Sequence, residues 1–379
     1  MSSRIPFRFG LSAFLLSFVI GSGASAQETS ENQEDAPFIE DTSELSEKSK
    51  EELRDEGFVF GADANLSTSS TATLVALIAG LPIHGIGHLW IDDSRTGNTL
   101  LIAEGISIAT MAAAGTYIWL DSGSSSASGW MSSVFELGLS SFAIGYLLDV
   151  IGTVQGVDRE FTLNTRNSQR YTAEAGYGFL STEEIPTRHL LNFGLGADFG
   201  AFYTKLDATS DIEVASLSGS LLLGTRFLRL RPQSFVFVEA KGEVFGFREA
   251  GPFWRSTVEG RLGGSLDMGT FFTQLNQVAV GFWVGYGQDF LRFEEDFAVD
   301  FEGGSAFLTQ QAFIHFNATE NLNIFFGHGR HPSWYIPAVN RLVGTTDVEI
   351  RYRTNFGRLK VGATIGSGLG LSIGGQMGF

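Results

Sequence analysis

The sequence predicts a mainly β protein: a transmembrane antiparallel β-barrel of about ten strands over residues 187–379, preceded by an apolar segment of three helices. Two patterns carry this prediction. From about residue 187, apolar and polar residues alternate with a period of two, which is the spacing of side chains on one face of a strand. Residues 69–155 instead contain long apolar stretches, rich in Ala and Leu, in which no such alternation occurs.

Residues 1–26 have the three parts of a secretory signal peptide. Arg4 and Arg8 give a positive start. A short apolar core follows over Leu11–Ile20 and leads to small residues, Ala24-Ser25-Ala26, that suit a cleavage site. This core is too short to span a bilayer. We therefore expect an exported chain whose mature form begins at residue 27.

The mature chain is expected to begin with an acidic, disordered periplasmic arm over residues 27–60. Residues 27–57 hold twelve acids against three bases, a net of −9 out of −17 for the chain. So charged a segment buries too little apolar surface to offset its ordering entropy. A periplasmic partner for this arm is one prediction. The acidity argues against a nucleic-acid partner, and the absence of cysteine excludes disulfides.

Three apolar stretches, Thr71–Trp90, Thr99–Leu120 and Trp130–Ile151, predict a helical unit over residues 69–155. The second is long enough to span a bilayer. However, buried acids and small residues suit close packing between helices equally well. Two arrangements stay open: a unit packed on or beside the barrel, which the sequence favours, and helices that truly span the membrane.

A short motif, Pro82-Ile83-His84-Gly85-Ile86-Gly87-His88, stands before the second helix. It resembles the Gly-x-Gly-His helical hairpin of P13-like and TM2-like bacterial membrane proteins. His84 and His88 are four residues apart, so on one helix they would share a face, as a metal-binding pair does. Because glycine weakens a helix, the sequence favours a tight glycine-assisted bend, and we expect no metal.

The alternation defines the barrel strands. Leu191, Phe193, Leu195 and Tyr203 fall on one predicted face, and Asp198 falls on the other. The ten predicted strand segments are 188–204, 211–227, 234–247, 254–268, 276–290, 305–316, 321–329, 346–355, 358–365 and 369–379. A further alternation at 171–179 makes twelve strands the alternative.

The last residue, Phe379, ends an alternating strand. This ending resembles the C-terminal signature that the barrel assembly machinery reads in Gram-negative outer-membrane barrels. The resemblance implies a location in the outer membrane, with that machinery and outer-membrane lipid as partners. Short connections such as 229–233 would be periplasmic turns, and the longer ones at 290–304 and 330–345 would face outward. A soluble β-sandwich is the alternative.

A lipid-surrounded barrel needs an apolar outer face and a polar inner one. The predicted inner face carries a set of charged residues: Glu239, Lys241, Glu243, Arg255, Glu259, Arg261, Glu349, Arg351 and Arg353. Opposite charges on neighbouring strands can pair, which avoids the cost of isolated buried charge. The sequence favours a structural charge network, with a selectivity filter or substrate site as the alternative.

The segment 330–337 contains two prolines, two aromatic residues and the pair His331 and Ser333. The His-x-Ser spacing resembles the motif of outer-membrane lipid A deacylases, although Trp334 stands where that family has asparagine. The resemblance implies Ser333 as nucleophile, His331 as base and an acid such as Glu349 to orient the imidazole. A rigid surface loop with interfacial aromatic residues is the alternative.

No phosphate loop, nucleotide fingerprint, Cys/His metal pattern or hydrolase elbow is present, so we expect no cofactor. The favoured function is a structural, interaction or small-solute channel role. A lipid-modifying acyl hydrolase is the alternative. The sequence therefore does not decide whether the protein is an enzyme, although it favours a protein that is not.

Overall fold

The computed structural model describes the helical unit, the barrel wall and most of its turns. The described residues are 66–120, 125–155, 170–182, 187–213, 216–231, 233–247, 253–275, 277–293, 306–319, 321–330, 344–366 and 368–379. The predicted signal peptide and acidic arm lie outside these residues, as do His331 and Ser333.

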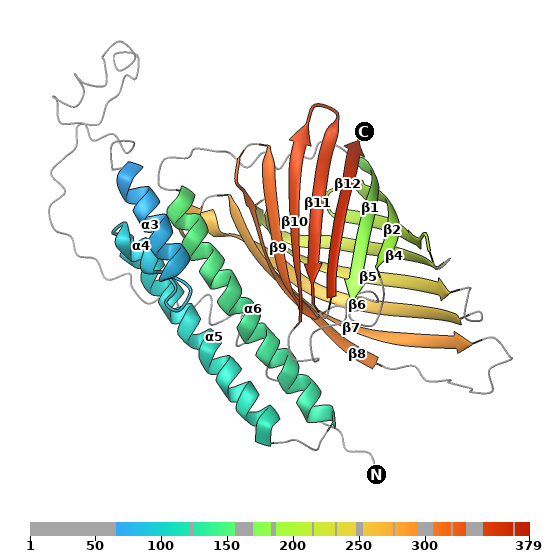
Figure 1. The fold of residues 1–379 in the computed structure, drawn as a ribbon, viewed down its shortest axis with the longest axis horizontal. Coiled ribbons are helices and arrows are strands. Elements are labelled where there is room, and N and C mark those ends of the chain that lie inside the picture. The colour runs from blue at the N-terminus through green and yellow to red at the C-terminus, as the bar shows by residue number, and fades with distance from the viewer. Residues whose placement is uncertain are drawn as a thin grey trace.

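Twelve antiparallel strands form a closed barrel in which each strand pairs with its neighbours in the chain and β1 pairs with β12 (Figure 1). The strands are β1 (Tyr171–Thr182), β2 (Arg188–Asp198), β3 (Phe202–Asp211), β4 (Leu217–Arg231), β5 (Ser234–Phe247), β6 (Phe253–Asp267), β7 (Val278–Phe293), β8 (Ala306–Asn317), β9 (Leu322–Arg330), β10 (Thr345–Thr354), β11 (Gly357–Ile365) and β12 (Gly368–Gly378). The predicted transmembrane barrel fold is confirmed, with the higher of the two strand counts.

The two strands beyond the favoured count of ten are β1 and β3. The wall begins at Tyr171 rather than near residue 187. The predicted segment 188–204 joins β2 to the start of β3 because the turn between them is short. Asp198 accepts a hydrogen bond from the Gly200 N–H at 2.8 Å, and Gly200 has a φ of 84°. The register pairs Asp198 with Tyr203, so Tyr203 points inward. Its predicted place on the outer face was wrong.

With two additional strands the number of strands stays even, so the barrel still begins and ends at the end that carries the short turns. The end that carries the backbone pairing of Tyr171 with Phe379 also carries the connections after β2, β4, β6, β8 and β10. We call this the short-turn end. The longest connections, 294–305 and 331–344, leave from the opposite end, which we call the long-loop end.

The outer wall is apolar and exposed. Leu195 and Val258 are 57% and 58% exposed, and the outward residues of β12 are similarly open. Exposed aromatic rings gather near both ends, for example Phe199 and Phe379 at the short-turn end and Trp254 and Phe290 at the long-loop end. Closure pairs every strand edge, and an apolar outer belt between aromatic girdles is the surface that a bilayer requires. The barrel therefore spans a membrane.

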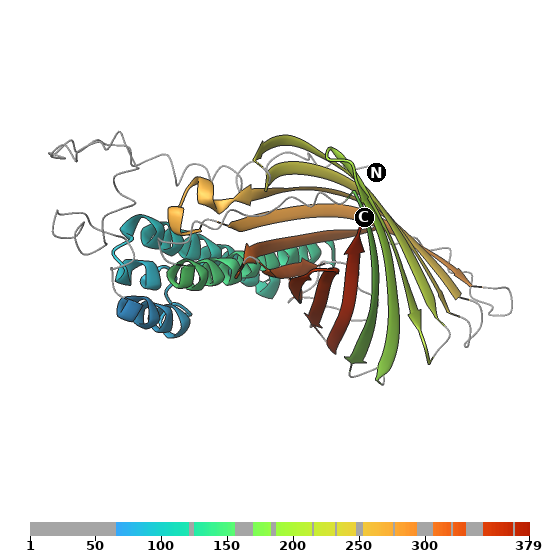
Figure 2. The ribbon, with the colours of Figure 1, turned by 90° about the horizontal axis from the view of Figure 1, so that it is seen from above.

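The helical unit contains four helices rather than three: α3 (Leu66–Ile78), the short α4 (Ile86–Trp90), α5 (Ser94–Leu120) and α6 (Ser125–Gln155). Helix α6 lies between α5 and the outer wall of the barrel, against β8 and β9 (Figures 1 and 2). Ile144, Leu148 and Ile151 of α6 share one buried apolar cluster with Leu275 and Ile314 of the barrel. The unit is therefore packed on the barrel.

A tight bend between α3 and α4 contains the glycine–histidine motif. Gly85 has a φ of 86°, and a Cβ there would lie 2.2 Å from the Gly97 carbonyl oxygen. The Asp149 carboxylate accepts hydrogen bonds from the Gly87 and His88 N–H groups at 3.3 and 3.2 Å. The Glu104 carboxylate accepts one from the His84 N–H at 2.8 Å. Buried acids of α5 and α6 therefore satisfy backbone donors that the bend leaves free.

Candidate functional site

The lumen contains charged side chains from most strands of the wall. The predicted residues lie on three of them: Glu239, Lys241 and Glu243 on β5; Arg255, Glu259 and Arg261 on β6; Glu349, Arg351 and Arg353 on β10. Arg261 lies 2.8 Å from Glu259 and 3.9 Å from Glu239. Lys241 lies 2.8 Å from Glu243, and Arg351 pairs with Glu349. These pairs form along a strand and between neighbouring strands.

Several lumen partners were not identified from the sequence. Arg255 pairs with Asp289 of β7, which also accepts a hydrogen bond from Thr257 at 2.7 Å. Lys360 of β11 donates to Glu174 of β1 at 2.7 Å and so reaches across β12. The sequence predicts a strand over the glycine-rich segment that holds Asp289, but the predicted set of lumen charges does not include this acid. Residue 174 lies before the predicted start of the barrel.

Several lumen contacts cross an intervening strand at a glycine. Tyr203 of β3 donates to Glu239 of β5 at 2.5 Å, and a Cβ on Gly224 of β4 would lie 2.6 Å from the tyrosine oxygen. Thr309 of β8 reaches Glu259 of β6 over Gly285 in the same way, and Gln311 of β8 reaches Asp347 of β10 over Gly327. Because the middle strand has no side chain at these points, the partners lie flat along the wall instead of across the lumen.

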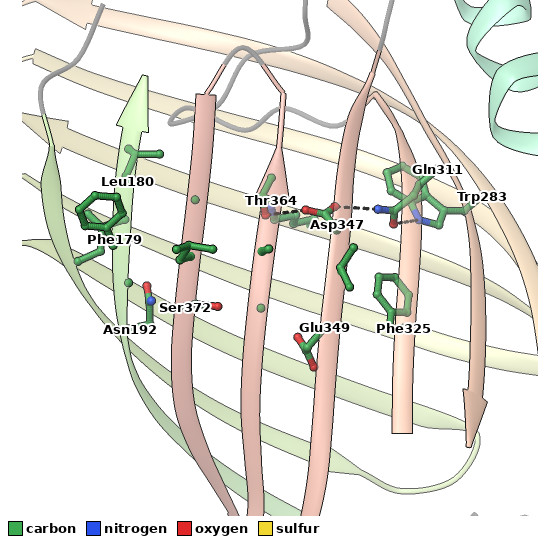
Figure 3. Close-up of a pocket in the computed structure, with 18 of the residues that line it drawn as sticks. Phe179, Leu180, Asn192, Trp283, Gln311, Phe325, Asp347, Glu349, Thr364 and Ser372 are labelled. Atoms are coloured by element: carbon green, nitrogen blue, oxygen red, sulfur yellow. Dashed lines mark hydrogen bonds between the residues drawn. The ribbon is translucent and has the colours of Figure 1, made fainter. Parts of the chain in front are cut away.

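A row of polar side chains continues around the wall in the half nearer the long-loop end. The indole N–H of Trp283 donates to Gln311 at 3.2 Å, and the Gln311 amide donates to Asp347 at 3.1 Å. Thr364 donates to the other carboxylate oxygen of Asp347 at 2.7 Å (Figure 3). Each group in this row has a partner, so its side chains are held in place.

This row borders a cavity of about 490 Å³ inside the barrel (Figure 3). The charged residues that line the cavity are two bases and two acids: Lys241, Arg261, Asp347 and Glu349. Asn192, Gln311, Thr364 and Ser372 add neutral polar groups, and Phe325 and Trp283 add aromatic surface. The cavity is therefore polar, nearly balanced in charge and large enough for a small solute.

The predicted hydrolase residues are not brought together within the described chain. His331 and Ser333 lie outside it, and the third residue, Glu349, points into the lumen and pairs with Arg351. The residue that precedes His331, Arg330, is on the outer wall and binds Glu136 of α6. The acyl hydrolase stays a prediction. In the described residues, no group of three or more His, Cys, Asp and Glu side chains is placed to hold a metal ion.

No protein-family model matches the chain, and no curated protein matches it. Among solved structures, the KdgM porin is similar, with 12% identity, a TM-score of 0.35 and coverage of 54% of this chain and 99% of the porin. The NanC porin has 9% identity, a TM-score of 0.37, and 55% and 99% coverage. Outer membrane phospholipase A from Escherichia coli has 11% identity, a TM-score of 0.32, and 58% and 93% coverage. These values show no family for the chain.

Proposed function

We propose that the protein is an outer-membrane channel for small polar solutes. One observation supports this above all. The lumen side chains pair along the wall, across glycines such as Gly285 and Gly327, and leave a polar cavity of about 490 Å³ within the barrel. A barrel of twelve strands is also wider than the smallest barrels, whose interiors are filled by side chains.

The charge of the cavity indicates what kind of solute would pass. Two bases and two acids line it, so neither cations nor anions meet a strong barrier of one sign. The polar row from Trp283 to Thr364 offers hydrogen-bonding groups that are held by their own partners. We therefore expect weak ion selectivity and passage of neutral or zwitterionic solutes.

The proposed location in the outer membrane rests on the predicted signal peptide, the spanning barrel and the outward, exposed ring of Phe379. Assembly by machinery that reads Phe379 belongs to the same proposal. Cell fractionation tests the location: the mature chain, beginning at Gln27, should appear in the outer membrane and migrate differently on a gel before and after heating. Recovery in the inner membrane alone would contradict it.

Planar-bilayer conductance of the refolded chain tests the channel. Ser372 lines the cavity, whereas its neighbour Ile373 is exposed on the outer wall. A Ser372→Trp variant should lower the single-channel conductance because the indole occupies lumen volume, and the matched Ile373→Trp variant should leave it unchanged. An unmodified chain that forms folded barrels without any conductance would overturn the proposal. A lipid A deacylation assay on the same sample tests the acyl hydrolase.

A further inference from the structure

The helical unit presents an apolar surface away from the barrel. Ile102, Ile106 and Ile108 of α5 are exposed, Ile102 at 59%. Exposed apolar residues of α3 and of the bend extend this surface: Leu74, Leu77, Ile78, Leu81 and Ile83. Because α6 packs directly on β8 and β9, this surface continues the apolar outer belt of the barrel. A patch of this extent needs a covering partner.

The length of α6 matches the thickness of a bilayer. At the long-loop end, Gln310 of β8 donates to the Ser133 carbonyl oxygen at 2.6 Å. At the short-turn end, Gly152 lies against Leu275, in the connection between β6 and β7. Nineteen residues separate these two points, which is about 28 Å of helix and close to the roughly 30 Å of a hydrocarbon core. Both α5 and α6 are long and apolar enough to cross a membrane.

Aromatic residues mark both ends of the pair of helices. Trp119 and Trp130 flank the α5–α6 connection at the long-loop end and are exposed, Trp119 at 78%. Trp90, at the end of α4, is exposed at the short-turn end. Tryptophan prefers the two interfaces of a bilayer, where its ring meets acyl chains and its N–H meets water.

The acids of α5 and α6, Glu104, Glu136 and Asp149, are all buried, which is the reverse of a helix at a water-exposed surface. Glu136 is fully buried against the barrel wall and binds Arg330 at 2.8 Å. Ser140 donates to the His328 carbonyl oxygen at 3.2 Å, and Asp149 binds the bend. Acids within an apolar segment are tolerated in lipid only when they face protein partners.

We propose that α5 and α6 cross the same bilayer as the barrel, as a transmembrane helical hairpin docked on its outer wall. Lipid acyl chains cover the exposed face of α5, and α3 and the bend lie against the half of the hairpin nearer the short-turn end. The α5–α6 connection then emerges on the side of the membrane that carries the long loops.

Site-directed labelling of the full chain tests this topology, and the absence of native cysteine makes single-cysteine variants simple to interpret. Arg95 and Leu120 are exposed at opposite ends of α5, and Ile106 lies between them. In oriented vesicles, a membrane-impermeant maleimide should label Leu120→Cys from one side only and Arg95→Cys from the other side only. Ile106→Cys should resist the reagent until detergent is added.

A nitroxide spin label at the same three positions gives an independent readout of depth. At Ile106 the label should collide with oxygen, which dissolves in lipid, far more often than with a water-soluble nickel complex. Heat-modifiable migration of each variant verifies that the barrel has folded. Labelling of Arg95→Cys and Leu120→Cys from the same side, or free access of aqueous reagents to Ile106→Cys in vesicles, would overturn the proposal and place the helices in water.

Discussion

Arg330 donates a hydrogen bond to Glu136 at 2.8 Å on the outer wall of the barrel, where α6 covers β8 and β9. The Glu136 side chain is fully buried, and Gln310 lies 3.4 Å from its second oxygen. This pair joins α6 to the end of β9. Both charges leave water when the helix docks. The cost of burying either one is therefore offset only when the other is present to pair with it.

The first prediction concerns that dependence. Glu136→Leu leaves Arg330 without its carboxylate and should weaken docking of α6 by about 3–5 kcal/mol. The double variant Glu136→Leu with Arg330→Leu should recover most of the loss, because neither charge then has to be buried alone. The distance between spin labels on α6 and β8 in reconstituted protein measures docking. A double variant whose labels lie as far apart as those of the single variant would show that the pair is not coupled.

The second prediction concerns export. A fully apolar α6 would be retained by the inner membrane. An acid within a spanning segment opposes its insertion, by about 2.5–3.5 kcal/mol at the segment centre on the insertion scale and by less towards its ends. Glu136 and Asp149 therefore favour passage across the inner membrane, and their partners satisfy them after folding. Glu136→Leu with Asp149→Leu should divert the chain to the inner-membrane fraction. Glu136→Gln with Asp149→Asn, which stays polar, should still reach the outer membrane. Equal distributions would contradict this role.

The third prediction concerns ion selectivity of the lumen. Asp347 and Lys241 line the same cavity with opposite charges. Asp347→Asn should shift the reversal potential in a salt gradient towards anion preference, and Lys241→Gln should shift it towards cation preference. Shifts of the same sign, or none, would mean that ions do not pass this cavity.

The sequence was informative wherever side-chain period alone determines structure. Alternation placed most barrel strands and the inward charges Glu259 and Arg351. It failed at β3, where Lys205, Asp207 and Thr209 dominate and few apolar residues mark the outer face. The turn at Gly200 also shifts the alternation by one residue. Odd-numbered residues face outward in β2 and inward in β3, which the alternation pattern alone cannot show.

The docking of α6 was left open by the sequence because it depends on contacts between distant segments. A signal was nevertheless present. Gln310 and Arg330 occupy outward positions that alternation assigns to lipid, and both bind α6 instead. The lumen pairs across glycine were also out of reach, because they join strands that are not neighbours, as Gln311 and Asp347 do.

The last prediction tests which face of the wall meets lipid, using two adjacent residues of β4. Leu221 is exposed on the outer face, whereas Ser220 points inward and pairs in register with Glu243. An arginine on the lipid-facing wall costs up to about 2–4 kcal/mol, most at the midplane and less towards the interfaces. Leu221→Arg should therefore lower the folded fraction in liposomes, measured by heat-modifiable migration over a urea series. Ser220→Arg should lower it less, because the new guanidinium lies opposite the Glu243 carboxylate. A larger loss for Ser220→Arg would mean that Ser220 faces lipid and Leu221 faces the lumen. Because each strand is paired in register with its neighbours, the inner and outer faces of the whole barrel would then be the reverse of those described.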